Sequence, residues 1–473
     1  MAVKYSFYVE PFEETGRPKR FLEAMAAILK HSNYGFLLDI YSKIRTRCTR
    51  CRVDCQIYQA SNDPRDIPCA RSELIMKIYR RYFTPAGRMS AKVFGGFTLT
   101  DEFIDDMTER LYNCTACRRC KITCPMGIDH GLITHLSRWI LAEIGIIPKA
   151  LVVATREQID GDSKNTSAIP IAALKDTCEF LEEELMEIYN VPVKFPIDVE
   201  GADYVFFPAV SDYLLEPDTL MGNAAVFHAT GDKWTIGSKY YDGINYGLFY
   251  SDRMWDKIVN MEVAEVKRLG GKNILIGECG HASRSAKVGV PNFCTDDELP
   301  PVINIMEYTY RVIKEGRLKL KGKVIDERVT YHDPCNIARS GWIVDQPREM
   351  LRMICKDYVD MYPNGPDNYC CGGGGGSVSI DEVRKYRTMT TGETKARQIR
   401  ETGAKYVVAP CANCKKQLKE VCEDHGLDEV EIVGLHDLLL KAIVFPETAQ
   451  TDAEAGAAED NAAEDNAERT VQQ

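Results

Sequence analysis

The sequence predicts an α+β multidomain protein, in which a helical module rich in cysteines precedes two α/β modules. Eight of the 18 cysteines fall within residues 48–124, among segments whose apolar residues follow helical spacing. From about residue 202, short apolar runs alternate with helical segments, which is the pattern of α/β units. That pattern occurs twice, with matching apolar runs and cysteine-bearing turns offset by 125–132 residues.

Length and charge bound the class of protein. A chain of 473 residues suits about three domains. Residues 447–473 contain eight acidic residues and one arginine, which accounts for −7 of the net charge of −11 and leaves −4 for the body. A nearly balanced body gives no sign of nucleic-acid binding. We expect residues 446–473 to form a disordered acidic tail, because they lack large apolar side chains.

Neither a signal peptide nor a transmembrane helix is expected. Residues 1–7 lack a basic region followed by an apolar run. The most apolar long stretch, residues 139–153, is interrupted by Glu143, Pro148 and Lys149. In a reducing compartment, clustered cysteines indicate metal or redox chemistry rather than disulfides. The sequence therefore predicts a cytoplasmic protein that can dock onto a membrane partner.

The first 201 residues are expected to be helical. We predict bracing helices in residues 1–47 and a helical metal-binding module in residues 48–145, which includes a helix at Asp101–Tyr112. A helical linker follows at residues 146–201. Its main helix, Pro170–Tyr189, carries Cys178 on an apolar stripe, where a packed thiol is expected.

A tightly spaced cysteine run is the strongest metal-binding signal in the helical module. It reads Cys114-x2-Cys117-x2-Cys120-x3-Cys124-Pro125. This is the bacterial ferredoxin signature, in which three cysteines hold one [4Fe-4S] cluster and the fourth reaches a second cluster. The run therefore predicts two cubane clusters.

A looser group, in which Pro68 precedes the last cysteine, supplies the remaining thiols. The expected sets are Cys48, Cys51, Cys55 and Cys124 for the first cubane, and Cys69, Cys114, Cys117 and Cys120 for the second. A zinc site is the alternative for the looser group, because Cys-x2-Cys pairs also bind zinc. Its ligands would be Cys48, Cys51, Cys55 and Cys69.

The second α/β module carries the pattern on which the main site is predicted. Cys370 and Cys371 are adjacent and precede five glycines. A disulfide between neighbours is strained, whereas two neighbouring thiols can turn opposite ways and hold two parts of one cluster. Glycines let backbone amides approach a sulfide-rich cluster closely. Three loops would together deliver five thiolates, from Cys335, Cys370, Cys371, Cys411 and Cys414.

The two α/β modules, residues 202–326 and 327–445, look like two copies of one unit. In the first copy Cys279 matches Cys411, but Ala282 stands where Cys414 would be. One thiol cannot build a cluster, so we expect the first copy to have lost its metal. Cys279 and His281 could act as a thiol and a proton donor in a cleft between the copies, or be structural residues.

These motifs together resemble the D subunit of heterodisulfide reductases. The pattern from Cys335 through Cys370-Cys371-Gly372 to Cys411-x2-Cys414 resembles the cysteine-rich CCG domain. Two α/β CCG domains behind an α-helical two-cluster ferredoxin module would cover most of the chain. The resemblance implies two cubane [4Fe-4S] clusters and one noncubane [4Fe-4S] cluster, the latter on the five CCG cysteines. Within the family, the turn at residues 277–282 is most similar to the DsrK type, or to its relative TmcB.

The resemblance also implies an activity and partners. The chain would reduce or form an S–S bond, with a disulfide or trisulfide on the small protein DsrC as substrate, in dissimilatory sulfur metabolism. Electrons would come from a DsrM-like membrane cytochrome b subunit linked to menaquinol. The chain would then lie on the cytoplasmic face of the inner membrane, attached through partner subunits. His332, three residues before Cys335, and His281 are candidates for proton transfer.

Two other functions stay open. One is the iron–sulfur subunit of a glycolate, lactate or glycerol-3-phosphate dehydrogenase, which passes electrons between a flavin subunit and quinone. The chain has no Gly-x-Gly-x-x-Gly fingerprint opening a βαβ unit, so no flavin is expected on it. The other is a pure electron relay. The loss of cysteines from the first copy alone favours the disulfide reductase.

Overall fold

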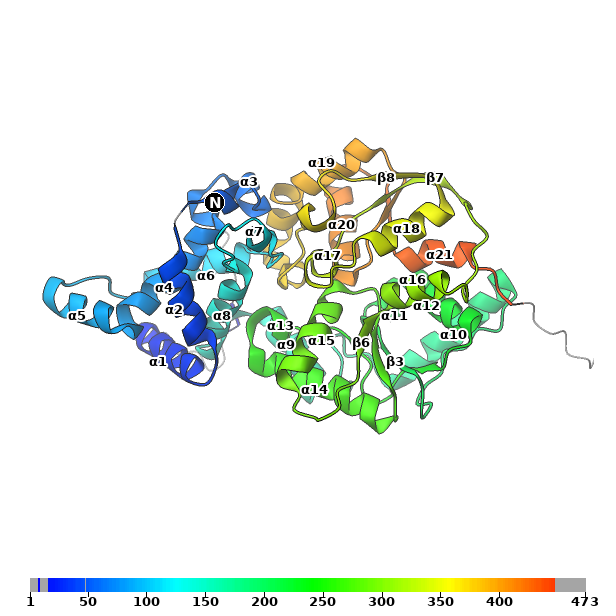
Figure 1. Cartoon of the computed structure of the whole chain (residues 1–473), viewed down its shortest axis with the longest axis horizontal. Coiled ribbons are helices and arrows are strands. Elements are labelled where there is room, and N and C mark those ends of the chain that lie inside the picture. Colours follow the sequence, from blue (N-terminus) through cyan, green and yellow to red (C-terminus); the bar gives the residue numbers. More distant parts are fainter. Residues whose placement is uncertain (1–6, 9–15, 47, 447–473) are drawn as a thin grey trace, which may run out of the picture.

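The chain folds into a helical part and a larger α/β body, at the left and right of Figure 1. The structure, a computed structural model, describes residues 7–8, 16–46 and 48–446. The start of the expected N-terminal helices and the expected acidic tail from residue 447 lie outside these residues. Within them, no helix is both long and apolar enough to cross a membrane. The predicted fold class, a helical module followed by two α/β modules, is confirmed.

Short helices and irregular loops build the helical part around one apolar core, to which Phe21, Ile75, Ile104 and Leu136 contribute fully buried side chains. Its α-helices are α1 (Arg17–Lys30), α2 (Tyr34–Ile44), α3 (Gln56–Ser61), α4 (Pro68–Phe83), α5 (Pro85–Phe94), α6 (Asp101–Asn113), α7 (Arg119–Ile122) and α8 (His130–Glu143). Two of the longer helices, α6 and α8, begin at side-chain caps, Thr100 and Asp129. The Thr100 hydroxyl accepts a hydrogen bond from the amide of Phe103 at the start of α6.

The segment between the helical part and the sheets is mainly helical, as expected. Strand β2 (Ile147–Pro148) pairs antiparallel with β1 (Phe7–Tyr8) and joins the two ends of the helical part. Helices α9 (Lys149–Asp160) and α10 (Ile171–Tyr189) follow. The Cys178 thiol is buried on the apolar stripe of α10, where it packs in the core.

Two four-stranded parallel sheets form the body. The first contains β3 (Tyr204–Phe207), β4 (Trp234–Thr235), β5 (Asn273–Ile276) and β6 (Val302–Asn304). The second contains β7 (Ile325–Tyr331), β8 (Cys355–Asp360), β9 (Tyr406–Val408) and β10 (Glu431–Val433). The spatial orders are β4-β3-β5-β6 and β8-β7-β9-β10, so both units place their strands as second, first, third and fourth. Cys355 begins β8 and packs in the core.

Helices cover both sheets (Figure 1). Those of the first unit are α11 (Asp212–Leu215), α12 (Pro217–Thr230), α13 (Gly247–Tyr250), α14 (Asp252–Arg268), α15 (Gly280–Phe293) and α16 (Ile305–Lys314). Those of the second are α17 (Cys335–Ser340), α18 (Asp345–Ile354), α19 (Glu393–Thr402), α20 (Ala412–Asp424) and α21 (Leu435–Ala442). The two units meet closely, because a Cβ added at Gly222 on α12 would lie 2.2 Å from the carbonyl oxygen of His436 on α21.

The cysteine-bearing turns lie where parallel strands end. Cys279 follows β5 and precedes α15, Cys411 follows β9 and precedes α20, and Cys335 opens α17 after β7. Carboxyl ends of parallel strands are the usual place for sites in α/β folds. The fold therefore gathers these three thiols from strands of two different sheets.

Candidate metal centre

The five cysteines of the second unit form one continuous group of sulfur atoms. The Cys370 thiol is within hydrogen-bonding reach of Cys335 and Cys371. Cys371 also reaches Cys414, and Cys414 reaches Cys411. All five side chains are 2–8% exposed. All 18 cysteines of the chain are free of disulfides, so these thiols are available to bind metal.

The hydrogen bonds among the thiols divide their protonation preferences, because those that Cys335 and Cys414 make with neighbouring thiols raise the pKa values of these two cysteines well above the usual range. Hydrogen bonds from Cys370 and Cys414 hold the pKa of Cys371 well below its usual range. Hydrogen bonds from Cys279 and Cys414 do the same for the pKa of Cys411. Backbone amides add to this effect, because the Gly372 nitrogen lies 3.4 Å from the Cys370 sulfur and the Gly373 nitrogen 3.4 Å from the Cys371 sulfur. Thiolates are the ligands of iron–sulfur clusters, so the donor set fits such a group.

The first unit contributes to the same group. Ligand atoms of Cys279, His281 and Cys411 all lie within 4.8 Å of one another. Nδ1 of His281 is 2.9 Å from the side-chain nitrogen of Asn413, and the ring packs edge-on against Phe249. The structure thus brings both tentative residues of the first unit against the predicted cluster ligands.

His332 also lies beside the thiol group, on the side opposite His281. A ring nitrogen lies within 4.8 Å of the sulfur atoms of Cys371 and Cys414. Nδ1 is 3.3 Å from the side-chain nitrogen of Asn368, and Nε2 has no hydrogen-bond partner among the described residues. Burial holds the pKa of His332 well below its usual range, so the ring is neutral.

A buried lysine determines which nitrogen of His332 carries the proton. Lys395 is completely buried, and its Nζ donates to the side-chain oxygen of Asn368 at 2.9 Å and to Gln398. In its ammonium form Lys395 has only donors, so the Asn368 oxygen then faces it and the amide nitrogen faces His332. Nδ1 of His332 therefore accepts, and Nε2 carries the proton.

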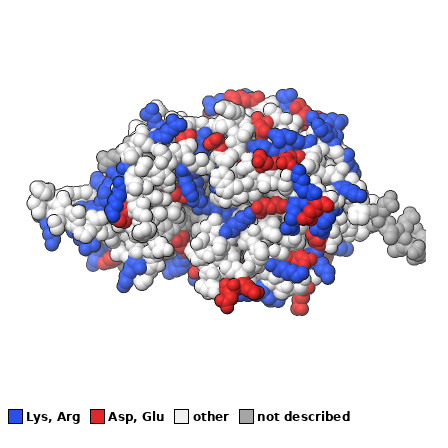
Figure 2. Space-filling model, in the orientation of Figure 1, with Lys and Arg blue, Asp and Glu red and all other residues white. Residues whose placement is uncertain are grey.

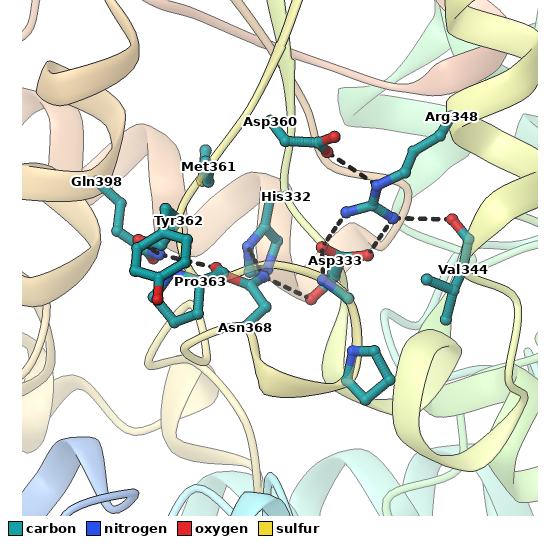
Figure 3. Close-up of polar contacts among 12 residues, drawn as sticks. His332, Asp333, Val344, Arg348, Asp360, Met361, Tyr362, Pro363, Asn368 and Gln398 are labelled. Atoms are coloured by element: carbon teal, nitrogen blue, oxygen red, sulfur yellow. Dashed lines mark hydrogen bonds and ion pairs between the residues drawn. The ribbon is translucent and has the colours of Figure 1, made fainter.

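The turn that carries His332 is clamped by ion pairs (Figure 3). Both side-chain oxygens of Asp333 accept from Arg348, each at 2.7 Å. Arg348 also donates to Asp360 at 2.8 Å, and the Gly365 amide donates to Asp333 at 2.8 Å. Such bidentate pairs give geometric precision. They keep the loop between β8 and Cys370 in place against the start of α17.

In the helical part, eight cysteines line two cavities. One cavity, of about 530 Å³, is lined by Cys48, Cys51, Cys69 and Cys124. The other, smaller cavity is lined by Cys55, Cys114, Cys117 and Cys120. This lining differs from the expected ligand sets in one respect, because Cys55 and Cys69 exchange places. It also separates Cys55 from the three other thiols of the alternative zinc site.

The geometry of helix α4 explains why Cys69 and Cys55 line different cavities. Cys69 and Arg71 are two residues apart on α4, so they point to nearly opposite sides of that helix. The Cys69 sulfur forms a hydrogen bond with the Cys51 thiol, whereas the Arg71 guanidinium is 3.4 Å from the Cys55 sulfur in the other cavity. Helix α4 therefore forms the wall between the two cavities.

Comparisons with known proteins match both cysteine-rich regions of the chain. Residues 46–128 match the family model of the 4Fe-4S dicluster domain, and residues 329–419 match that of the cysteine-rich CCG domain. The chain contains both domains. It is an iron–sulfur protein whose dicluster domain lies in the helical part and whose CCG domain holds Cys335, Cys370, Cys371, Cys411 and Cys414.

Similar proteins are subunits of oxidoreductases. An "Hdr-like menaquinol oxidoreductase iron-sulfur subunit 2" of Archaeoglobus fulgidus is 27% identical over 91% of this chain and 85% of its own length. The D subunit of the dihydromethanophenazine:CoB--CoM heterodisulfide reductase of Methanosarcina barkeri is 24% identical over 79% of this chain and 87% of its own length. The resemblance to the D subunit of heterodisulfide reductases is thereby confirmed.

The dicluster and CCG domains touch at their cysteines. The Cys117 thiol is within hydrogen-bonding reach of Cys370. Arg339 on α17 donates to the carbonyl oxygen of Cys117 at 3.1 Å, and Arg119 lies over the Tyr369 ring at 4.1 Å. A cysteine of the second cavity therefore meets a cysteine of the CCG domain without an intervening residue.

Sequence reasoning missed several residues that shape this centre. Asn368 and Asn413 lie within two residues of predicted ligands, so their positions in the motifs were an available signal. Arg339 lies one helical turn after Cys335 on α17, whereas the buried cations Arg138 and Lys395 lie outside the cysteine motifs and had no local signal. They reach the centre only through tertiary contacts.

Proposed function

We propose that the chain is the iron–sulfur catalytic subunit of a membrane-associated complex that reduces or forms an S–S bond. The observation that carries the proposal is the unbroken series of sulfur contacts from Cys117 through Cys370 and Cys371 to Cys414 and Cys411. It joins the dicluster domain to a second, chemically different thiol set. Such a series suits an electron-transfer path that ends at a reaction site.

Three ligand sets follow from the geometry. We propose cubane [4Fe-4S] clusters on Cys48, Cys51, Cys69 and Cys124, and on Cys55, Cys114, Cys117 and Cys120. A noncubane [4Fe-4S] cluster would be held by Cys335, Cys370, Cys371, Cys411 and Cys414. When bound, these groups supply storage for single electrons and iron that accepts sulfur ligands.

The two histidines suit the negative charge that develops on sulfur during the reaction. Reduction of one S–S bond to two thiols consumes two electrons and two protons. His281 and His332 lie on two sides of the thiol group, and each has an asparagine amide at Nδ1. With Nδ1 so engaged, Nε2 is the nitrogen left to donate toward the nearby sulfur atoms. We infer that each ring donates a hydrogen bond to one developing thiolate and stabilises its charge. A neutral imidazole is too weak an acid to give up that proton, so the two protons of the reaction enter from solvent.

The substrate and partners are proposed from family resemblance. The chain would be of the DsrK type, act on a disulfide or trisulfide of a DsrC-like protein, and serve dissimilatory sulfur metabolism. Its electron donor would be a DsrM-like cytochrome b subunit exchanging electrons with menaquinol. The relative named as a menaquinol oxidoreductase subunit supports this quinol link. We place the chain on the cytoplasmic face of the membrane.

An electron paramagnetic resonance (EPR) experiment tests this function. The purified holoprotein is oxidised with and without a reduced DsrC-like thiol protein. We expect a new paramagnetic signal that the thiol protein perturbs and that Cys370→Ser and Cys371→Ser abolish. Cys178→Ser, a packed core thiol on α10, is the matched control and should leave the signal unchanged.

Two outcomes would contradict the proposal. An EPR signal that the thiol protein does not change would indicate that the third cluster only transfers electrons, as in a flavin-linked dehydrogenase subunit. Metal analysis is the second check. Three four-iron clusters require about twelve irons and no zinc per chain, whereas about eight irons with one zinc would contradict the cubane assignment.

A further inference from the structure

Helix α5 projects from the dicluster domain and has no buried residue. It forms the outermost tip of the helical part in Figure 1. Met89 is 69% exposed, Val93 71% and Phe94 85%. Most large apolar side chains of the described residues are buried, so three such side chains on one ten-residue helix are unusual.

The exposed apolar face is a consequence of how α5 packs. Gly87 faces α4, because a Cβ added there would lie 1.8 Å from the carbonyl oxygen of Arg80. Met89 and Val93 lie one turn apart on the opposite side of the helix. The helix therefore rests on α4 through its small residues and turns its large apolar residues outward.

Positive charge surrounds this apolar tip. Residues 74–100 contain no Asp or Glu, and they contain Lys77, Arg80, Arg81, Arg88 and Lys92. Arg88 and Lys92 are exposed and lie one turn apart, next to the line of Met89 and Val93. Figure 2 shows the left end of the molecule as a white tip with blue residues behind it.

We propose that α5 inserts its apolar tip into the headgroup region of an anionic phospholipid membrane. A helix with exposed apolar side chains beside Lys and Arg, lying in the interface, is a known mode of membrane contact. The positive charge complements anionic headgroups. Ten residues are few for a stable protein interface, which buries roughly 20–30 residues on each side. A lipid surface needs only this small tip.

This contact goes beyond the proposed function. In that function partner subunits hold the chain at the membrane, whereas here the chain touches lipid itself. The contact would orient the dicluster domain toward the membrane. It involves no cysteine, so it stands or falls independently of the cluster chemistry.

Vesicle sedimentation tests the proposal with the full-length holoprotein. We expect the protein to pellet with phosphatidylglycerol-rich vesicles, to pellet much less with pure phosphatidylcholine vesicles, and to be released as salt rises. The double variant Arg88→Glu with Lys92→Glu should bind at least about tenfold more weakly. Met89→Ser with Phe94→Ser should lower the binding that persists at high salt.

The design separates lipid binding from misfolding. None of these side chains is buried, so iron content and melting temperature should stay unchanged. Leu214→Ser with Leu215→Ser is the matched control, because these leucines are 59% and 62% exposed on α11, far from α5. It should bind vesicles as the unaltered protein does.

Three results would overturn the proposal. The first is that the unaltered protein pellets equally with and without anionic vesicles. The exposed helix would then be a contact for a protein partner. Equal binding by the α5 variants is the second. Loss of binding in the Leu214 and Leu215 control would show that the contact lies elsewhere. A failed EPR test of the thiol chemistry would leave the lipid result unchanged.

Discussion

Cys370 and Cys371 are neighbours in sequence but serve different parts of the thiol group. The Cys370 sulfur contacts Cys117 and Cys335, whereas the Cys371 sulfur contacts Cys414. Their two sulfur atoms lie within hydrogen-bonding reach of each other, and each reaches a different neighbour. One dipeptide can therefore connect the dicluster domain on one side with the turn after β9 on the other.

Serine variants test the corrected cubane sets. Cys48→Ser and Cys69→Ser should alter the same cubane EPR signal, because both thiols line one cavity. Cys55→Ser and Cys114→Ser should alter the other signal. If Cys55→Ser instead reproduced the spectrum of Cys48→Ser, the grouping expected from sequence would be correct.

Lys395 is a buried cation next to the thiol group. Its Nζ donates to the neutral side chains of Asn368 and Gln398, and burial lowers its pKa to about 7. Asp333, followed by Cys371, Cys370 and Cys414, raises that pKa by negative charge. A buried charge needs a counter-charge, which Asp333 and the thiolates supply.

We expect Lys395→Met to lower the reduction potential of the third cluster. Removing one nearby positive charge disfavours the added electron, by roughly 50–100 mV at an effective dielectric constant of about 20. Redox titration followed by EPR measures the shift. Lys395→Arg keeps the charge and should shift the potential less, provided that iron content is unchanged. Equal potentials for Lys395→Met and the unaltered protein would contradict this role.

Among the elements, the glycine loop after Cys371 decides how closely the two domains meet. A Cβ added at Gly374 would lie 2.4 Å from the carbonyl oxygen of Thr115, in the cysteine run of the dicluster domain. The guanidinium of Arg138 on α8 donates to the carbonyl oxygens of Gly375 at 2.8 Å and Cys114 at 2.7 Å. The loop thus lets a sulfur of one domain reach a sulfur of the other.

Gly374→Ala should push the domains apart and slow electron transfer between them. The added methyl group meets backbone, which cannot move without displacing the Cys114 loop. Freeze-quench EPR should show slower oxidation of the cubanes by the third cluster, and the melting temperature should fall. Gly35→Ala is the control, because its Cβ would meet only an ordinary contact of 3.4 Å. Unchanged kinetics in Gly374→Ala would show that this close approach is not required.

At the scale of the whole molecule, buried charges join the two α/β units. Glu278, next to Cys279, accepts hydrogen bonds from the amides of Leu435 at 3.0 Å and His436 at 2.8 Å. Asp212 of the first unit is fully buried without a hydrogen-bond partner among the described residues. Both carboxylates lie near Lys415 of the second unit. The unit without a CCG motif is thus part of the centre's support.

Asp212 should make stability depend on pH. Burial raises its pKa to about 8, although Lys415 opposes the shift; Glu216, Glu278 and Cys411 add to it. Between pH about 4 and about 8 the unfolded chain loses this proton and the folded chain keeps it. The contribution of Asp212 to the free energy of unfolding therefore falls as pH rises, by at most about 1.4 kcal/mol per pH unit.

Asp212→Asn removes this dependence. Compared with the variant, the unaltered protein should lose stability from pH 5 to pH 8, measured as anaerobic melting temperatures. Asp218→Asn, an exposed carboxylate on α12, is the control and should leave the pH dependence as it is. Parallel pH profiles for the unaltered protein and Asp212→Asn would contradict a proton held at Asp212.

Local patterns predicted much of this protein. Two motifs are contiguous in sequence: the ferredoxin spacing from Cys114 to Cys124, and the adjacent Cys370 and Cys371. Each lies within a short segment, so it can be recognised without knowledge of the tertiary structure. The helix expected at Asp101–Tyr112 appears as α6 for the same reason. Spacing cannot say which way a thiol on a helix faces relative to a distant loop, which is why the two cavities group Cys55 and Cys69 differently from the sets expected from spacing.

By itself, the sequence determined the fold class and which thiols are candidates for metal, because periodicity and short spacings act within one segment of chain. Only the tertiary structure decided which thiols share a cavity, that Cys117 meets Cys370, and that Cys279 and His281 join the group. It also brought Lys395 and Arg138 to the centre. These contacts link residues up to hundreds of positions apart, and they form because the strand ends of two sheets and one helical part pack around the same sulfur atoms.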